Sequence, residues 1–109
     1  MIYFDNAATT KPSAFALEKA KKFNEEEFFN PSALYRGGLS ASLAIKEARE
    51  TMLKTLGAST TDKEVIFTSC GSESDNTAIF CAARRGIFVT DKGEHSAVYK
   101  CFTELKARG

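Results

Sequence analysis

The chain has 109 residues, 43% of them hydrophobic, which is enough for one ordinary core but short for an enzyme of two domains. Fifteen Lys and Arg residues against fourteen Asp and Glu leave a net charge of +1, so no basic field draws in nucleic acid or an anionic membrane. No apolar run reaches the roughly 20 residues of a membrane span, and the start Met-Ile-Tyr-Phe-Asp does not resemble a signal peptide. We therefore expect a cytoplasmic protein that binds neither nucleic acid nor membrane.

The first part of the chain predicts an arm followed by a helix. Residues 1–4 can form a short strand, and residues 5–12 are a small, polar, turn-forming segment, so residues 1–12 are expected to form an N-terminal arm. Ser13 is a suitable N-cap for a helix that runs to about Phe28. The acidic run Glu25-Glu26-Glu27 opposes the helix dipole and predicts early fraying of this end.

The middle of the chain predicts a turn and a longer helix. Asn30-Pro31 breaks the first helix, and the pair Gly37-Gly38 indicates a flexible stretch. Apolar residues then recur at helical spacing from about Leu39 to Leu56, and Gly57 is the expected C-cap.

The second half of the chain alternates between strand and helix patterns. We expect a buried strand at 64–69, a helix at 73–84 that Gly86 ends, a strand at 87–90 and a helix capped by Ser96. This order implies a right-handed βαβ unit, so the predicted fold class is α/β, with a partial parallel sheet and flanking helices. Because a parallel strand normally has neighbours on both sides, residues 13–109 are expected to form an incomplete domain that further chain or a second copy completes.

The turn after the first buried strand has the composition of an anion-binding cradle. Cys70, Gly71 and Ser72 precede an acidic first helical turn, where unpaired N–H groups and the helix dipole favour a phosphate. Taken alone, a Gly-Ser turn before a helix is more often a plain capped helix than an anion site, and only the surrounding motifs reverse that.

The three cysteines give no sign of a metal centre. Cys70, Cys81 and Cys101 are odd in number and form no C-x-x-C pair, which argues against a disulfide framework and against a zinc site. We expect reduced thiols and no metal. Cys70 is open to two interpretations, a nucleophile at a helix N-terminus or a small filler in the turn.

Four motifs together resemble the cysteine desulfurases. They are the segments Tyr3-Phe-Asp-Asn-Ala-Ala-Thr-Thr10, Asn30-Pro-Ser32, Phe67-Thr-Ser-Cys-Gly-Ser-Glu-Ser-Asp-Asn76 and Glu94-His95. Their order and approximate spacing resemble the N-terminal part of that family from one end of this chain to the other. The resemblance implies the N-terminal portion of the large domain of a fold-type I enzyme of the aminotransferase class V branch, with pyridoxal 5′-phosphate as its cofactor.

The resemblance also implies roles for individual residues. Gly71 and Ser72 would hold the cofactor phosphate, and His95 would stack over the pyridine ring and act as a catalytic acid or base. Asn6, Ala7 and Asn30 would border the substrate side. The family converts L-cysteine to L-alanine and leaves a persulfide on the enzyme. The resemblance also implies a homo-oligomer and a sulfur-acceptor protein as partners.

This sequence departs from the family pattern at several points. None of its ten lysines stands in the Ser-x-His-Lys context of the family's cofactor-binding lysine, and the persulfide-forming cysteine of the family is placed beyond residue 109. Ser72 stands where Thr is usual, Cys70 where Gly is usual, and Tyr35 where His is common. We therefore expect this chain alone to be inactive and to bind the cofactor weakly or not at all.

Two other interpretations stay open. The chain could be a non-catalytic α/β module that associates with itself through exposed strand edges. It could also belong to a selenocysteine lyase or to another class V enzyme, since these residues do not separate such activities.

Overall fold

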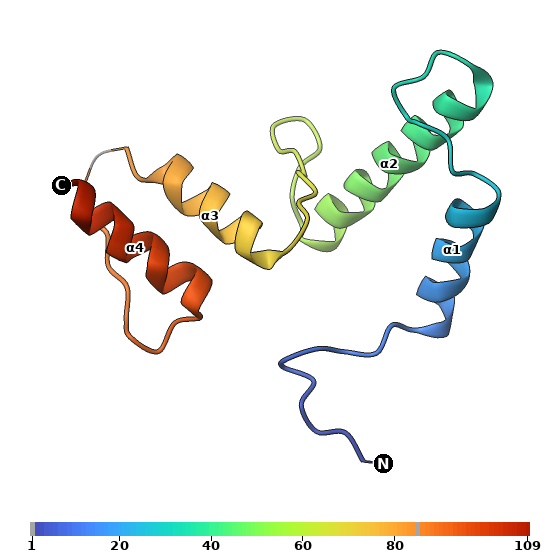
Figure 1. The fold of residues 1–109 in the computed structure, drawn as a ribbon. Helices are drawn as coiled ribbons and strands as arrows, with labels where there is room; N and C mark the ends of the chain where they lie inside the picture. The colour runs from blue at the N-terminus through green and yellow to red at the C-terminus, as the bar shows by residue number, and fades with distance from the viewer. Residues whose placement is uncertain (1, 85) are drawn as a thin grey trace. The chain divides into compact units, whose positions relative to one another are not determined.

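The computed structural model describes residues 2–84 and 86–109. In these ranges the chain forms the helices α1 (Ala14–Glu25), α2 (Arg36–Thr55), α3 (Gly71–Ala82) and α4 (Ser96–Arg108), which Figure 1 shows. The chain divides into two compact units, one ending at Val65 and containing α1 and α2, the other running from Ile66 to Gly109 and containing α3 and α4. No helix in the described ranges is both long enough and apolar enough to cross a membrane.

Helix α1 begins and ends for local reasons. The Ser13 hydroxyl accepts a hydrogen bond from the Ala16 N–H at 3.1 Å, which confirms the predicted N-cap. The helix ends at Glu25, three residues before the predicted Phe28, as the acidic run suggested. Lys22 Nζ lies 2.7 Å from a Glu27 carboxylate oxygen. Glu27 follows the end of α1, and this ion pair joins it to the last turn of the helix.

Helix α2 ends in a Schellman motif. Gly57 has a φ of +66°, its N–H donates to the Lys54 carbonyl at 3.0 Å, and the Ala58 N–H donates to the Leu53 carbonyl at 2.9 Å. A left-handed residue at this place satisfies two carbonyl groups that the helix itself leaves free. The predicted role of Gly57 in ending the helix is confirmed, with Leu56 as the formal C-cap.

The pair Gly37-Gly38 is not a flexible stretch, and the predicted start of the helix at Leu39 was three residues late. Both glycines lie in the first turn of α2, and Gly38 is buried. A Cβ on Gly38 would overlap the Ala33 carbonyl oxygen and would lie 2.8 Å from the Asn30 carbonyl oxygen. The preceding loop therefore passes so close to the helix that it leaves no room for a side chain.

The predicted strands at 1–4, 64–69 and 87–90 are absent from the described residues, so the sheet predicted from the sequence is not formed there; Met1 lies outside the described residues. The physical reason is that a strand exists only through hydrogen bonds to a neighbouring strand. No backbone hydrogen bond joins 64–69 or 87–90 to another described segment. The apolar, β-branched composition that predicted these strands does not itself supply a partner.

Helices α3 and α4 pack against each other and run in the same direction (Figure 1). Phe80 of α3 and Leu105 of α4 line one groove together with Phe88. Cys101 is 3% exposed, and its thiol lies 3.0 Å from the Ala97 carbonyl oxygen within α4. The guanidinium of Arg108 lies 5.4 Å from the centre of the Phe80 ring, within the range of a cation–π contact.

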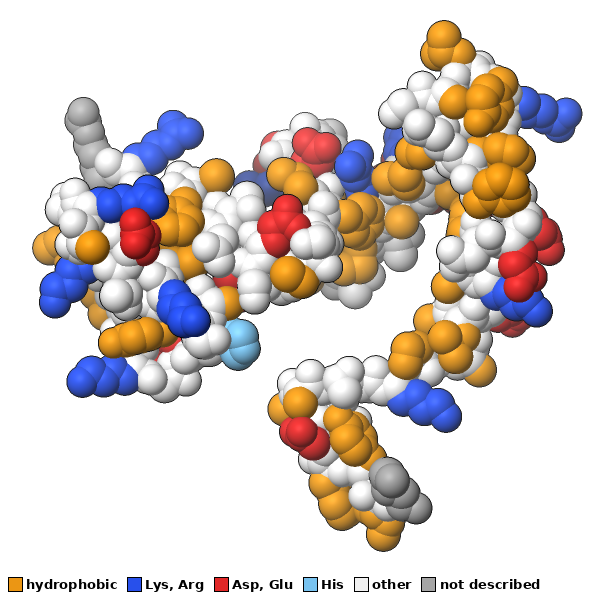
Figure 2. Space-filling view, viewed as in Figure 1, with side chains coloured by type: hydrophobic (Ala, Val, Ile, Leu, Met, Phe, Trp, Pro, Cys, Tyr) orange, Lys and Arg blue, Asp and Glu red, His pale blue; other side chains and the backbone are white. Residues whose placement is uncertain are grey.

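The described residues bury little apolar surface. Among the hydrophobic residues, those that are buried are Ala41, Leu53 and Cys101. Large apolar side chains remain exposed in both units, and Figure 2 shows hydrophobic side chains (orange) spread over the surface. The ordinary core expected from composition is therefore not formed by the described residues, because their apolar segments lack a covering layer.

Candidate anion-binding site at the start of α3

The N-terminus of α3 differs from those of α1 and α4 because no side chain caps it through a hydrogen bond. Cys70 is the N-cap residue, with an extended backbone, and the first backbone bond of the helix runs from the Ser74 N–H to the Cys70 carbonyl at 3.2 Å. The N–H groups of Gly71, Ser72 and Glu73 have no backbone acceptor within the described residues. Such groups, together with the positive end of the helix dipole, favour an anion.

Side chains around the turn hold it in one conformation. The Glu73 carboxylate oxygen Oε2 accepts from the Ser69 N–H at 2.7 Å and from the Ser69 hydroxyl at 2.6 Å. The Thr68 hydroxyl donates to the Cys70 carbonyl at 3.0 Å and lies 2.6 Å from the Ser74 hydroxyl. The two hydrogen bonds from Ser69 lower the pKa of Glu73, with the Ser69 hydroxyl as the main cause and the Ser69 N–H as the second.

The pKa of the Cys70 thiol is also affected by the groups at the start of α3. The backbone N–H of Glu73, the Ser69 hydroxyl and the backbone N–H of Ser72 lower the pKa of the Cys70 thiol, while desolvation and, to a smaller extent, the Glu73 charge oppose this effect. No hydrogen bond from the first helical turn to the sulfur meets ordinary geometry, and sulfur is a weak acceptor. The N–H groups thus favour a negative charge at the turn and stay available to a stronger acceptor.

The residues present fit a phosphate group. A Cβ built on Gly71 would meet no other atom within 4 Å, so the space beside this residue is open. Ser72 is exposed and carries its hydroxyl in the first turn of the helix. The predicted helix began at Glu73, whereas the observed α3 begins at Gly71; this correction places Gly71 and Ser72 among the residues whose N–H groups are free.

His95 is the N-cap of α4, a role that the sequence assigned to Ser96. Its Nδ1 accepts a hydrogen bond from the Ala97 N–H at 3.2 Å. Because α3 and α4 run in the same direction, their N-termini lie at the same end of the helix pair (Figure 1). Gly71, Ser72 and His95 therefore belong to one end of one compact unit.

The three residues predicted for the substrate side belong to the first unit. The Asn6 carbonyl accepts from the Thr10 hydroxyl at 3.1 Å, and Ala7 lies in the adjoining turn. The Asn30 side-chain oxygen accepts from the Ser32 N–H at 2.9 Å, so this amide closes its own turn. A substrate role for Asn6, Ala7 and Asn30 stays a prediction.

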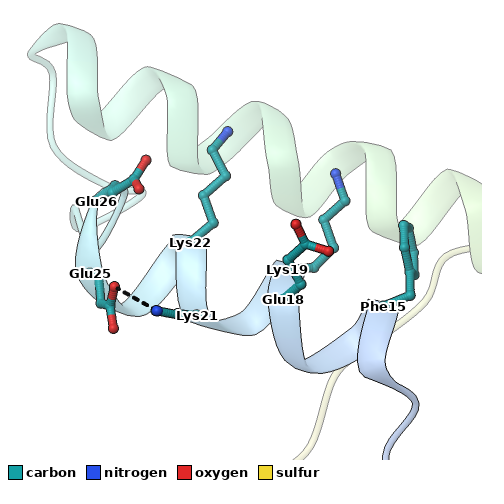
Figure 3. A pocket seen from close by; sticks show the side chains of 7 residues that line it. All are labelled: Phe15, Glu18, Lys19, Lys21, Lys22, Glu25 and Glu26. Carbon is teal, nitrogen blue, oxygen red and sulfur yellow. Dashed lines mark ion pairs between the residues drawn. The ribbon is translucent and has the colours of Figure 1, made fainter.

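A second hollow, along α1, has the character of a solvated helix face. Figure 3 shows its lining, in which the Lys21 ammonium pairs with Glu25 at 3.9 Å. The hollow is lined by residues of one helix and its C-terminal flank, namely Phe15, Glu18, Lys19, Lys21, Lys22, Glu25 and Glu26. Alternating charges at such spacing support an exposed helix and do not converge on one ligand.

Comparison with known proteins identifies the family. A sequence model of the family described as aminotransferase class-V matches residues 2–109. Because this match covers nearly the whole chain, the protein belongs to the aminotransferase class-V family. Within that family the chain is similar to the N-terminal region of the cysteine desulfurases, which confirms the resemblance seen in the motifs.

Individual relatives show how much of a longer protein the chain represents. It is 39% identical to the cysteine desulfurase NifS of Azotobacter vinelandii over 99% of this chain and 28% of that protein. It is 42% identical to the cysteine desulfurase IscS of Dictyoglomus turgidum, over 89% of this chain and 25% of the relative. A solved structure described as a NifS-like protein matches 99% of this chain and 30% of its own, with a TM-score of 0.85 and 34% identity. The chain thus spans between a quarter and a third of the length of these proteins.

Sequence reasoning missed the contact between Ser69 and Glu73. A signal for it was present, because an acidic residue three positions after an N-cap commonly reaches back to the start of the helix. In this chain Cys70 is the N-cap, and the Glu73 carboxylate accepts from the residue before it, Ser69.

Proposed function

We propose that this chain is the N-terminal segment of a pyridoxal-phosphate-dependent cysteine desulfurase and contributes the phosphate-binding part of the cofactor site. The observation that carries the proposal is the uncapped N-terminus of α3, with an open Gly71 and an exposed Ser72, in a chain of the class-V family. The parent protein would convert L-cysteine to L-alanine and an enzyme persulfide. It would act as a homo-oligomer and pass sulfur to an acceptor protein.

The residues of this chain would have distinct tasks in such a protein. The N–H groups of Gly71 and Ser72 and the Ser72 hydroxyl would bind the phosphate. His95 would cover the ring and hold or move a proton at Nε2, since its Nδ1 already caps α4. When bound, the cofactor supplies an electron sink for the amino acid. The lysine and the reactive cysteine of the family would come from other parts of the full-length protein, so this chain alone would not turn over cysteine.

Phosphate binding can be tested through Cys70, because an anion at the cradle competes with its thiolate for the same N–H groups. Iodoacetamide alkylation of Cys70 would be followed by mass spectrometry in the presence of millimolar 4′-deoxypyridoxine 5′-phosphate. The unphosphorylated compound is the matched control. We expect the phosphorylated compound alone to slow alkylation, with less slowing in Ser72→Ala than in Ser72→Thr, which keeps the hydroxyl. Equal rates with both compounds would refute the phosphate cradle.

Activity requires the remainder of a desulfurase. In a hybrid protein, residues 1–109 would replace the matching segment of the Azotobacter vinelandii relative, and alanine formation and bound cofactor would be measured. We expect the hybrid to retain the cofactor, and Ser72→Ala to weaken its binding about tenfold, the effect of losing one hydrogen bond to a charged group. A hybrid that folds, judged by circular dichroism and gel filtration, but retains no cofactor would contradict the proposal.

A further inference from the structure

The starts of α1, α3 and α4 differ in what occupies their first N–H groups. In α1 the N-cap Ser13 accepts from the Ala16 N–H at 3.1 Å. In α4 the N-cap His95 accepts from the Ala97 N–H at 3.2 Å. The N-cap of α3 is Cys70, and its side chain makes no such hydrogen bond. Because an ordinary cap would fill the positions that a phosphate needs, a group outside these positions must hold the turn if its N–H groups are to stay open.

Glu73 supplies such a group. Its Oε2 accepts from the Ser69 N–H at 2.7 Å and from the Ser69 hydroxyl at 2.6 Å. In a capping box the third helical residue bonds to the N–H of the N-cap. Glu73 is the third residue of α3, but it bonds to the residue that precedes the N-cap. The turn is thereby closed across Cys70, and no N–H group of the first helical turn is used.

A second bridge crosses the same residue. The Thr68 hydroxyl lies 2.6 Å from the Ser74 hydroxyl and donates to the Cys70 carbonyl at 3.0 Å. This bridge also joins a residue before the N-cap to a residue in the helix. Since it does not involve Glu73, we expect α3 to form when Glu73 is replaced, with loss of order confined to the turn.

The carboxylate of Glu73 has two opposite effects on phosphate binding. Its negative charge repels a phosphate, because like charges at short range oppose each other. Its hydrogen bonds to Ser69 order the turn before the phosphate arrives, which reduces the entropy lost on binding. The two effects have opposite signs, so they can be separated by removing the charge alone or the charge together with the acceptor.

We propose that Glu73 is a positioning residue of the phosphate cradle, which acts through Ser69 to hold the turn at Cys70 with the N–H groups of Gly71 and Ser72 unoccupied. In this role Glu73 touches neither the phosphate nor the substrate. The ordering by its hydrogen bonds outweighs the repulsion by its charge, so the chain binds a phosphate more tightly with Glu73 than without it. The inference rests on the proposed function, because the ligand is the phosphate of the same site.

The first measurement needs no ligand. Amide NMR spectra of the full chain, labelled with nitrogen-15, would be compared for the parent, Glu73→Ala and Glu73→Gln. In Glu73→Ala we expect the Ser69 amide proton to shift upfield and its temperature dependence to steepen, because this N–H loses its acceptor. Backbone mobility should rise at 69–72 and stay unchanged in the rest of α3. Glu73→Gln should restore both properties, since it keeps an oxygen acceptor at the same reach.

The second measurement is the affinity for a phosphate. The amide shifts of Gly71 and Ser72 would be followed during titration with 4′-deoxypyridoxine 5′-phosphate near neutral pH, with the unphosphorylated compound as the reference. We expect Glu73→Ala to weaken binding about fivefold or more, the effect of ordering one freed residue on binding. Glu73→Gln should bind as tightly as the parent or more tightly, because the acceptor remains and the negative charge is gone.

The matched control is Glu104→Ala in the same unit. The Glu104 carboxylate accepts from Arg108 Nε at 2.8 Å within α4, so this variant also removes one charge and one hydrogen bond, but away from the turn. We expect it to change the phosphate affinity less than twofold and to leave the Ser69 amide unchanged.

The two measurements separate this inference from the proposed function. A parent chain whose amides respond equally to both compounds would contradict the proposed function. A parent chain that prefers the phosphorylated compound, but whose affinity Glu73→Ala leaves unchanged or increases, would overturn the positioning role alone. That role would also be refuted by a Ser69 amide that does not respond to Glu73→Ala, or by a rise in mobility along the whole of α3, which would make Glu73 a general stabiliser of the helix.

Discussion

Replacing Gly38 by alanine should destabilise the first unit, although alanine is the better helix former. A Cβ at this position would overlap the Ala33 carbonyl oxygen and lie 2.8 Å from the Asn30 carbonyl oxygen, and both of these atoms belong to the backbone. Neither can swing aside as a flexible side chain does, so the loop must move away from α2. Overpacking of this kind costs about 1–3 kcal/mol. The better helix propensity of alanine returns at most about 1 kcal/mol, and less in a first turn.

The expected net loss is therefore about 1–2 kcal/mol in the free energy of unfolding. It would be measured by urea denaturation of the full chain, followed by circular dichroism at 222 nm. Gly71→Ala is the matched control, because it also lies in the first turn of a helix but would meet no atom within 4 Å. We expect this control to be neutral or slightly stabilising. If Gly38→Ala were as stable as the control, the close approach of the loop to α2 would be refuted.

Three further predictions concern the ends of α3 and α4. Because the backbone N–H of Glu73 and the Ser69 hydroxyl lower the pKa of Cys70, its alkylation rate should reach half of its maximum at a lower pH than that of N-acetylcysteine; an equal or higher midpoint would contradict the geometry of the turn. The pKa of Glu73 is lowered in the folded chain, so its stabilising effect is present above the ordinary glutamate range and is lost as the pH falls through the folded pKa. Helicity measured between about pH 5 and pH 2 should fall less in Glu73→Gln than in the parent chain. His95→Ala should destabilise α4 by about 1 kcal/mol, seen as faster amide exchange in its first turn, whereas His95→Asn should keep the cap.

The helices could be predicted because their signals are local. Ser13 and Gly57 act within a few residues of themselves, and both ended up at the predicted helix ends. The errors at helix starts also have local causes. Gly37 and Gly38 are typical of loops by composition, but they occupy the first turn of α2, where a Cβ on Gly38 would overlap the Ala33 carbonyl oxygen and one on Gly37 would lie 2.6 Å from the Phe29 ring. No sequence pattern shows how closely the preceding loop will approach the helix.

The sheet could not be predicted to form because its hydrogen bonds are not local. The residues around Phe67 and Phe88 have the composition of buried strands, but they form no regular element. A strand is nevertheless a property of a pair of segments, and no partner lies among the described residues. The candidate site could be predicted only in part. Gly71 and Ser72 were found from local composition, whereas the role of His95 in capping α4 depends on the orientation of its ring, which composition does not show.

The cap at the start of α4 has a consequence for the chemistry of His95. A nitrogen that accepts a hydrogen bond from a backbone N–H must be unprotonated, so the neutral ring is held in the tautomer with its hydrogen on Nε2. In this tautomer the free nitrogen is a donor. The capping hydrogen bond thus fixes the orientation of the ring as well as its tautomer, so that Nε2 presents its hydrogen from one defined position at the start of α4.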